Sequence, residues 1–170
     1  DYSVIEATHK DLTKIIKKIK NGSLTGINVT LPFKQKIINN VDKIINDAEQ
    51  TGSVNTILLD EDKFVIGENT DVFGLQAAYL KEIDNNSSKS SLVIGAGGVS
   101  PSVILSLQKS GIKNISITNR TIEKCYFVKK KFINIDILPW ENLKSEIQNF
   151  DIIVNATSLG LKNGDDFNFN

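Results

Sequence analysis

Four polar residues in the first half of the chain have the types and spacing of an acid–base site: Thr30, Lys34, Asn55 and Asp71. Each lies at or just beyond the predicted end of a strand. A lysine and an aspartate that converge on a hydroxyl group could exchange its proton, while a hydroxyl and an amide could hold neighbouring oxygens. Spacing alone also allows a solvated lysine and an aspartate that only caps the next helix. The capping and acid–base roles of Asp71 are compatible.

The second half contains a glycine-rich turn that could hold a phosphate group. A buried strand at 91–94 opens, directly before a predicted helix, into the run Gly95-Ala96-Gly97-Gly98-Val99. Glycines let the backbone approach a pyrophosphate, and the free N–H groups and dipole of a helix N-terminus attract it. The pattern departs from G-x-G-x-x-G because Ser100 occupies the last position. A tight strand-to-helix turn without a ligand is therefore an alternative.

Of the 20 lysine and arginine residues, only one is an arginine, Arg120. It lies where such a fold would select its cofactor. It follows a predicted strand at 115–118, at about the spacing that brings a second strand end to an adenosine ribose. Its planar fork matches phosphate oxygens better than a lysine does. Lys124 follows one helical turn later, and no acid stands at 118–122 to accept the ribose hydroxyls of NAD. These residues favour the 2′-phosphate of NADP; the plainer alternative is a surface arginine.

A third strand end, after 151–154, carries small polar residues. The predicted strand is followed by Asn155, Ala156, Thr157, Ser158 and, after Leu159, by Gly160. At the carboxyl end of a parallel strand such residues face the crevice where ligands bind. Thr157 and Ser158 could contact a cofactor, or they could only form the turn.

The elements that must position these residues can be predicted from periodicity and from end signals. Thr8 begins a helix with Asp11 as its capping-box partner, and Gly22 ends that helix. Pro32 fits the first turn of a second helix. The other elements predicted in this part are strands 2–7, 24–29, 54–59 and 64–66, the last two joined by the acidic turn 60–62, and helices 41–50 and 72–83.

Further along, strands and helices alternate with short loops. The predicted strands are 92–94, 115–118, 135–138 and 151–154, and the helices between them are 99–109, 121–131 and 141–148. Such alternation means a parallel sheet with crossover helices. We therefore predict an α/β protein of two domains, residues 1–71 and 72–170.

Composition excludes several classes of protein. The 170 residues are 40% hydrophobic and 24% charged with a formal net charge of zero, which is typical of a globular protein and argues against a nucleic-acid partner. No apolar run approaches the roughly 20 residues that span a bilayer, so no membrane partner is expected. The single cysteine, Cys125, rules out an internal disulfide and suggests a reducing compartment, the cytoplasm. With one histidine and one cysteine, no metal site of nitrogen and sulfur ligands is expected.

Six short motifs, taken together, resemble the shikimate dehydrogenase family. They are G-x-N-V-T-x-P-F-K at 26–34, S-V-N-T at 53–56, G-E-N-T-D at 67–71, G-A-G-G at 95–98, N-R-T at 119–121 and N-A-T-S-x-G at 155–160. They occur in the family's order and are spread over nearly the whole chain. Each is weak alone, but a substrate block combined with a nucleotide block is specific.

The resemblance implies an N-terminal α/β substrate domain followed by a Rossmann-like NADP-binding domain. It implies NADP-dependent, reversible reduction of 3-dehydroshikimate to shikimate in aromatic amino-acid biosynthesis, by a monomer or a homodimer. Lys34 and Asp71 would form the catalytic pair, and Thr30 and Asn55 would hold ring hydroxyls. NADP would contact the glycine turn and a group of later residues: Asn119, Arg120, Thr121 and Lys124.

Several alternatives stay open. A quinate/shikimate dehydrogenase, or a paralogue with another polyol acid as substrate, would share these motifs, and a non-catalytic NADP-binding module would share half of them. In the oxidative direction, either Lys34 acts as a neutral base after desolvation, or Asp71 takes the proton and Lys34 stays charged. The chain has no methionine and does not contain the family's N-terminal serine pair or its C-terminal glutamine segment. We therefore expect a piece of a longer protein, truncated in both domains, with an incomplete active site.

Overall fold

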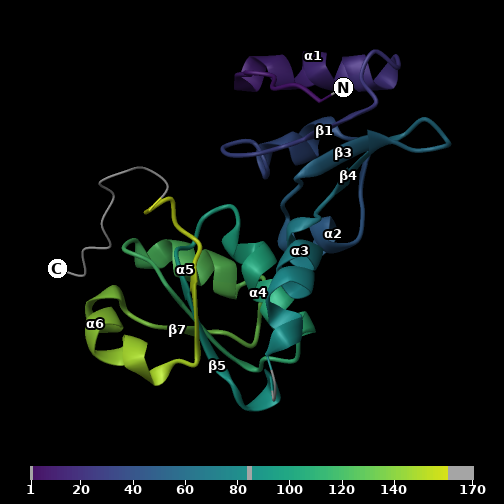
Figure 1. Ribbon diagram of the computed structural model, residues 1–170. Helices are drawn as coiled ribbons and strands as arrows, with labels where there is room; N and C mark the ends of the chain where they lie inside the picture. The colour runs from purple at the N-terminus through teal and green to yellow at the C-terminus, as the bar shows by residue number, and fades with distance from the viewer. Residues whose placement is uncertain (1, 84–85, 161–170) are drawn as a thin grey trace. The chain divides into compact units, whose positions relative to one another are not determined.

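The computed structural model describes residues 2–83 and 86–160, and the chain divides into two compact units, 1–70 and 71–170. Figure 1 follows the chain through unit 1 in purple and blue and through unit 2 in teal, green and yellow. Each unit combines helices with its own four-stranded sheet. The predicted α/β fold is confirmed.

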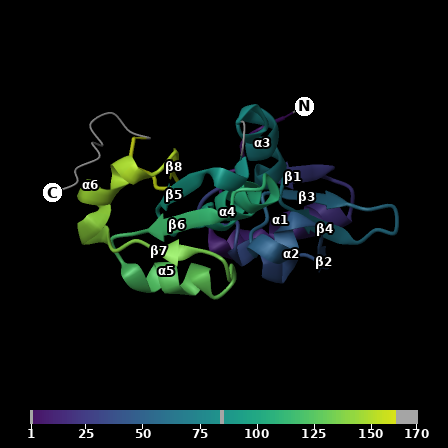
Figure 2. The same ribbon diagram turned by 90° about the horizontal axis from the view of Figure 1, so that it is seen from below.

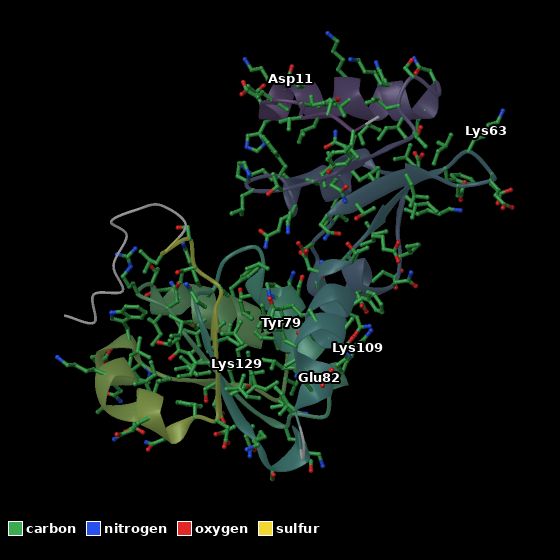
Figure 3. The ribbon with its side chains drawn as sticks, in the orientation of Figure 1. Asp11, Lys63, Tyr79, Glu82, Lys109 and Lys129 are labelled. Atoms are coloured by element: carbon green, nitrogen blue, oxygen red, sulfur yellow. The ribbon has the colours of Figure 1, made fainter. Side chains whose placement is uncertain are left out.

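The sheet of unit 1 has the strand order β1-β3-β4-β2. β1 (Gly26–Asn28) pairs antiparallel with β3 (Thr56–Leu59), and β3 pairs antiparallel with β4 (Val65–Glu68). β2 (Lys43–Ile44) runs parallel to β4. The predicted turn closes the β3–β4 hairpin, and Lys63, at its outer tip in Figure 3, has a φ of 65°.

The first helix begins as its capping signals predict. A 3₁₀ turn, His9–Asp11, leads into α1 (Leu12–Lys20). The Thr8 hydroxyl and the Thr8 N–H donate to Asp11 Oδ2 over 2.6 and 2.8 Å, and in that order they lower the pKa of the Asp11 carboxyl. Figure 3 places Asp11 on the helical segment that lies over the sheet. The apolar stripe of α1 packs in one core with the inner faces of β3 and β4, through Leu12, Ile16, Ile19, Ile57 and Val65.

Asp42 links α1 to the hairpin. Its Oδ1 accepts a hydrogen bond from Lys20 Nζ over 2.8 Å, and its Oδ2 accepts one from the Val65 N–H over 2.9 Å. These two bonds, the lysine first, lower the pKa of the Asp42 carboxyl. The charged form of Asp42 is therefore the form that holds the helix to the sheet.

Two predicted elements near the start of unit 1 are wrong. Residues 2–7 form no strand, because the ladder of β1 involves only β3 among the described residues. Pro32 does not begin a helix: the Leu31–Pro32 peptide bond is cis, and the residues after it form turns. The helical segment begins at Lys36 and is a 3₁₀ helix, Lys36–Asn40.

The predicted helix 41–50 is also wrong in its first half. That stretch forms β2, and only α2 (Asp47–Thr51) is helical. The Asp42 N–H donates to Val65 O over 2.9 Å, and the Ile45 N–H donates to Gly67 O over 3.0 Å. Pairing with β4 thus uses the backbone groups that a helix would need.

The sheet of unit 2 is parallel throughout, as predicted, with the order β7-β6-β5-β8 (Figure 2). Its strands are β5 (Ser90–Ile94), β6 (Asn114–Thr118), β7 (Asp136–Ile137) and β8 (Ile152–Asn155). The helices are α3 (Asp71–Ala78), α4 (Ser100–Lys109), α5 (Ile122–Lys129) and α6 (Leu143–Glu146). Short 3₁₀ turns at 80–82, 86–88, 140–142 and 147–149 complete the unit.

β5 is the central buried strand of unit 2, and its side chains alternate between two cores. Val93 packs in the larger core with α3, α4 and α5, whereas Leu92 and Ile94 pack with Leu143 of α6. Cys125 of α5 lies in the larger core, fully buried, and this burial raises the pKa of its thiol to about 11. Helices therefore cover both faces of the sheet and leave its strand ends for the turns described next.

Candidate active site

Two backbone hydrogen bonds hold the segment 29–34 beside Asn55. The Val29 N–H donates to Asn55 O over 2.7 Å, and the Val54 N–H donates to Lys34 O over 2.8 Å. Thr30 is exposed, Lys34 is half-buried, and Asn55 is only 8% exposed. The structure thus brings three of the predicted residues together where β1 ends and β3 begins.

The side-chain oxygen of Asn55 collects three donors. It accepts from the Thr70 N–H over 2.9 Å, from the Thr56 hydroxyl over 3.1 Å and from the Thr70 hydroxyl over 3.2 Å. A backbone N–H can only donate, so this contact identifies the atom as Oδ1. The other end of the amide, the NH₂ group, can only donate. Asn55 therefore suits a ligand atom that accepts a hydrogen bond, such as a hydroxyl oxygen.

Asn28 is a polar residue of this site that the sequence predictions did not select. Its Nδ2 donates to Thr56 Oγ1 over 3.3 Å, and its Oδ1 accepts from Tyr2 OH over 3.0 Å. Asn28 and Thr30 line a cavity of about 340 Å³ in unit 1, whose wall also includes apolar side chains such as Phe33. The sequence could have indicated Asn28, because Asn28 lies two residues before Thr30, and residues two apart on an extended segment point to the same side.

Asp71 is half-buried and is the first residue of α3. It directly follows Thr70, whose N–H binds Asn55. Lys34 lies in unit 1 and Asp71 in unit 2. Their association as an acid–base pair stays a prediction.

The glycine turn after β5 contains one glycine that the protein's own packing requires. Gly95 has a φ of +107°, and a Cβ added there would lie 2.7 Å from Thr157 Cγ2 and 3.0 Å from the backbone of Ala156. The Gly95 N–H donates to Thr118 O over 2.8 Å, which continues the ladder between β5 and β6. The turn is therefore packed closely against the ends of both neighbouring strands.

Gly97 differs, because packing does not demand a glycine there. It is exposed, its φ is outside the positive range, and an added Cβ would meet only Ala156 O, at 3.9 Å. α4 begins three residues later, and its N-cap residue, Val99, makes no side-chain cap. An exposed glycine directly before the N-terminus of a helix could let a phosphate group approach the backbone.

Asn119 joins the glycine turn to the turn after β6. Its Oδ1 accepts from the Ala96 N–H over 3.2 Å, and its Nδ2 donates to Thr121 O over 2.9 Å. Thr121 is the N-cap residue of α5. Arg120 is exposed on this turn, and Glu123 and Lys124 are exposed in the first turn of α5. If the glycine turn holds one phosphate, these two cations suit a second.

The turn after β8 is held by its own polar side chains. Asn155 Oδ1 accepts from the Thr157 N–H over 2.9 Å and from the Thr157 hydroxyl over 2.7 Å, and Thr157 Oγ1 accepts from the Leu159 N–H over 3.0 Å. The Thr157 hydroxyl is thus used in forming the turn, whereas Ser158 is exposed. β5, β6 and β8 are neighbours, so the three turns gather at one edge of the sheet. This edge is where open parallel sheets bind nucleotides.

Residues 2–83 and 86–160 contain neither a candidate metal site nor a candidate membrane-spanning helix. No cluster of three or more histidine, cysteine, aspartate or glutamate residues there could hold a metal ion. None of the helices in that range is both long and apolar enough to cross a bilayer.

Both units match known protein families. Residues 1–57 match the sequence model of the shikimate dehydrogenase substrate binding domain, and residues 78–161 match that of shikimate / quinate 5-dehydrogenase. A shikimate dehydrogenase (NADP(+)) of Pelagibacter ubique is 40% identical over 162 residues, which cover 95% of this chain and 59% of the relative.

Solved structures agree with these matches. The crystal structure of shikimate dehydrogenase from Aquifex aeolicus matches with a TM-score of 0.85 and 36% identity, over 95% of this chain and 59% of that chain. A shikimate dehydrogenase solved in complex with NADP+ matches with a TM-score of 0.84 and 31% identity, over 96% of this chain and 58% of that one. The chain therefore spans about three fifths of the length of the relatives that it matches.

Proposed function

Because the chain belongs to the shikimate dehydrogenase family, we propose that the full-length protein catalyses NADP-dependent, reversible reduction of 3-dehydroshikimate to shikimate. One observation carries the proposal: the two halves of such a site occur in one chain. In unit 1, backbone hydrogen bonds bring Thr30 and Lys34 beside Asn55, and in unit 2 Asn119, the residue before Arg120, binds the glycine turn. The single cysteine suits a reducing compartment, and we place the enzyme in the cytoplasm.

Lys34 and Asp71 are the proposed acid–base pair. NADPH, when bound, supplies a hydride to the ketone carbon. As the ketone oxygen gains negative charge, a protonated Lys34 stabilises it and donates the proton. In the oxidative direction the proton would leave the hydroxyl for Asp71 or for Lys34. The reduction needs one proton at one oxygen, and this pair supplies it.

The remaining polar residues would orient the ring and the cofactor. The Asn55 NH₂ group would donate to a ring hydroxyl oxygen, and Thr30 and Asn28 would bind further hydroxyls at the cavity wall. Residues 95–99 would hold the pyrophosphate, and Arg120 with Lys124 the 2′-phosphate. We place three further groups at the cofactor: the Asn119–Thr121 turn, Thr157 and Ser158. Of these, Asn119 and Thr157 would serve mainly by shaping the turns that they bridge.

A second candidate is oxidation of quinate. The description of the family model that matches unit 2 names shikimate and quinate together, which favours this reading over unrelated polyol acids. Comparing kcat/KM for shikimate and quinate in the full-length protein would decide between the two substrates. NADP binding without turnover of either would favour a non-catalytic module instead.

Variants of the acid–base pair test the mechanism. In the full-length protein, Lys34→Ala and Asp71→Asn should each lower kcat by about 10²–10⁴-fold, because proton transfer and oxyanion stabilisation act in the transition state. The KM for shikimate should change far less. Asparagine retains capping ability, so Asp71→Asn isolates the charge from the helix cap. Lys17→Ala, on the exposed face of α1, is the matched control and should leave both constants unchanged. Near-normal kcat in Asp71→Asn would show that Asp71 is only a cap.

A further inference from the structure

We propose that Thr56 and Thr70 are positioning residues of this site, and that both act through the side-chain oxygen of Asn55. All three residues belong to unit 1, and Asn55 Oδ1 is the point where their hydrogen bonds meet. The two hydroxyl oxygens also lie 3.4 Å from each other. The inference rests on the proposed function, because it concerns the placement of Asp71 and of the amides that would bind the substrate.

Two hydrogen bonds to Asn55 restrain Thr70, the last residue of unit 1. Its N–H donates to Asn55 Oδ1 over 2.9 Å and its hydroxyl over 3.2 Å, so one acceptor restrains both the backbone and the side chain of this residue. Asp71 is the next residue. The side chain of Thr70 is exposed, so burial does little to hold it and the hydrogen bonds must do so. Loosening them would leave the Asp71 carboxylate on a more mobile peptide.

Thr56 fixes the orientation of the side-chain amides of Asn28 and Asn55. Its hydroxyl donates to Asn55 Oδ1 over 3.1 Å and accepts from Asn28 Nδ2 over 3.3 Å. A hydroxyl can do both at once, because it has one proton and two lone pairs. β1 and β3 place these residues opposite each other, since Asn28 and Thr56 are register partners. Thr56 therefore orients Asn28 and Asn55 together, without touching the cavity that Asn28 lines.

The different partners predict different kinetic effects in the full-length protein. Removing the hydroxyl in Thr70→Val should lower kcat for shikimate oxidation about three- to tenfold with KM within about twofold, since a hydrogen bond of this kind typically contributes that factor. Thr56→Val should raise the KM for shikimate about three- to tenfold with kcat within about twofold. Thr70→Ser and Thr56→Ser keep the hydroxyls and should restore each constant. Thr25→Val, just before β1 and outside the network, is the matched control.

Amide hydrogen exchange tests the network without using activity. In the folded wild type the Thr70 amide should exchange at least about tenfold more slowly than an amide of an unstructured peptide, and Asn55→Ala should remove this protection. A Thr70 amide that exchanges freely in the wild type would overturn the network, whether or not the protein oxidises shikimate.

If the wild type turns over and both valine variants keep kcat and KM within about twofold, the positioning role is overturned. If the wild type does not turn over, the proposed function fails and the exchange result alone decides on the network. Thermal unfolding of each variant identifies those that do not fold, and for these the comparison of serine variants with wild type replaces the valine measurement.

Discussion

At the scale of single residues, we expect the selection of a nicotinamide cofactor to depend on Arg120, a planar cation just after the end of β6. Arg120→Ala should reduce the preference for NADP over NAD by roughly ten- to a hundredfold, because hydrogen bonds to charged groups contribute about 1.5–3 kcal/mol and only NADP has the 2′-phosphate. Kd values for both cofactors, measured by titration of the full-length protein, give the ratio. Lys113→Ala removes an exposed cation elsewhere in unit 2 and serves as the control. Equal losses of affinity for both cofactors would show that Arg120 has a structural role.

Gly95 and Gly97 of the glycine turn should respond differently to the same substitution. Gly95→Ala should destabilise unit 2 by about 1–3 kcal/mol, because the new Cβ meets Ala156 and Thr157 and the positive φ is strained. Gly97→Ala should leave stability nearly unchanged, because its Cβ meets no close neighbour, and should weaken NADP binding, because it adds bulk to the exposed backbone that a phosphate would have to approach. Thermal unfolding and cofactor titration separate the two effects. Normal NADP affinity in Gly97→Ala would contradict the assignment of this turn.

The types of residue in the sequence predicted which residues belong to the site, but not which of them contact one another. Thr30, Lys34 and Asn55 could be selected because hydroxyl, amine and amide groups recur at predicted strand ends. Their sequence distances do not show that two backbone bonds bring 29–34 beside Asn55. The roles of Asn28 and Thr56 depend on the antiparallel register of β1 and β3, which only the fold supplies.

Among the elements, the junction of α1 with the hairpin should be acid-sensitive. The pKa of Asp42 is lowered in the folded state, so its contribution to stability is present above the pKa of the unfolded state and is lost as pH falls through the folded value. Asp42→Asn should therefore show a smaller loss of unit 1 stability than wild type between pH 6 and pH 3. Urea midpoints at a series of pH values measure this. A variant that loses as much stability as wild type would place the acid sensitivity elsewhere.

The elements that the sequence predicted correctly are those whose formation depends on residues within the element itself. α4 was expected at 99–109 and runs over Ser100–Lys109, since its glycine start and apolar spacing lie within it. The first half of the helix expected at 41–50 was wrong because its apolar residues fit a short edge strand as well as a helix, and pairing with β4 decided the outcome. Likewise, an alternating pattern at 2–7 cannot supply the neighbour that a strand needs.

On the scale of the whole molecule, each unit has its own hydrophobic core, and no core cluster of the described residues includes side chains from both. Ile57→Ala, in the core of unit 1, should destabilise that unit by about 2–5 kcal/mol. The only tryptophan, Trp140, packs in unit 2 and should report an unchanged transition. Urea unfolding followed by fluorescence and by far-UV circular dichroism compares the two. If the tryptophan transition moves with the mutation, the units unfold together.

The burial of Cys125 has a practical consequence for measuring how the units move. Thiol reagents attack thiolates, and this thiol is enclosed and protonated at neutral pH, so it should not be labelled in the native state. Cysteines introduced at the exposed positions Lys18 in unit 1 and Lys113 in unit 2 would then carry a spin-label pair without removal of the natural cysteine. Dipolar spectroscopy on such a pair, with and without NADP, would give the distribution of distances between the units in solution.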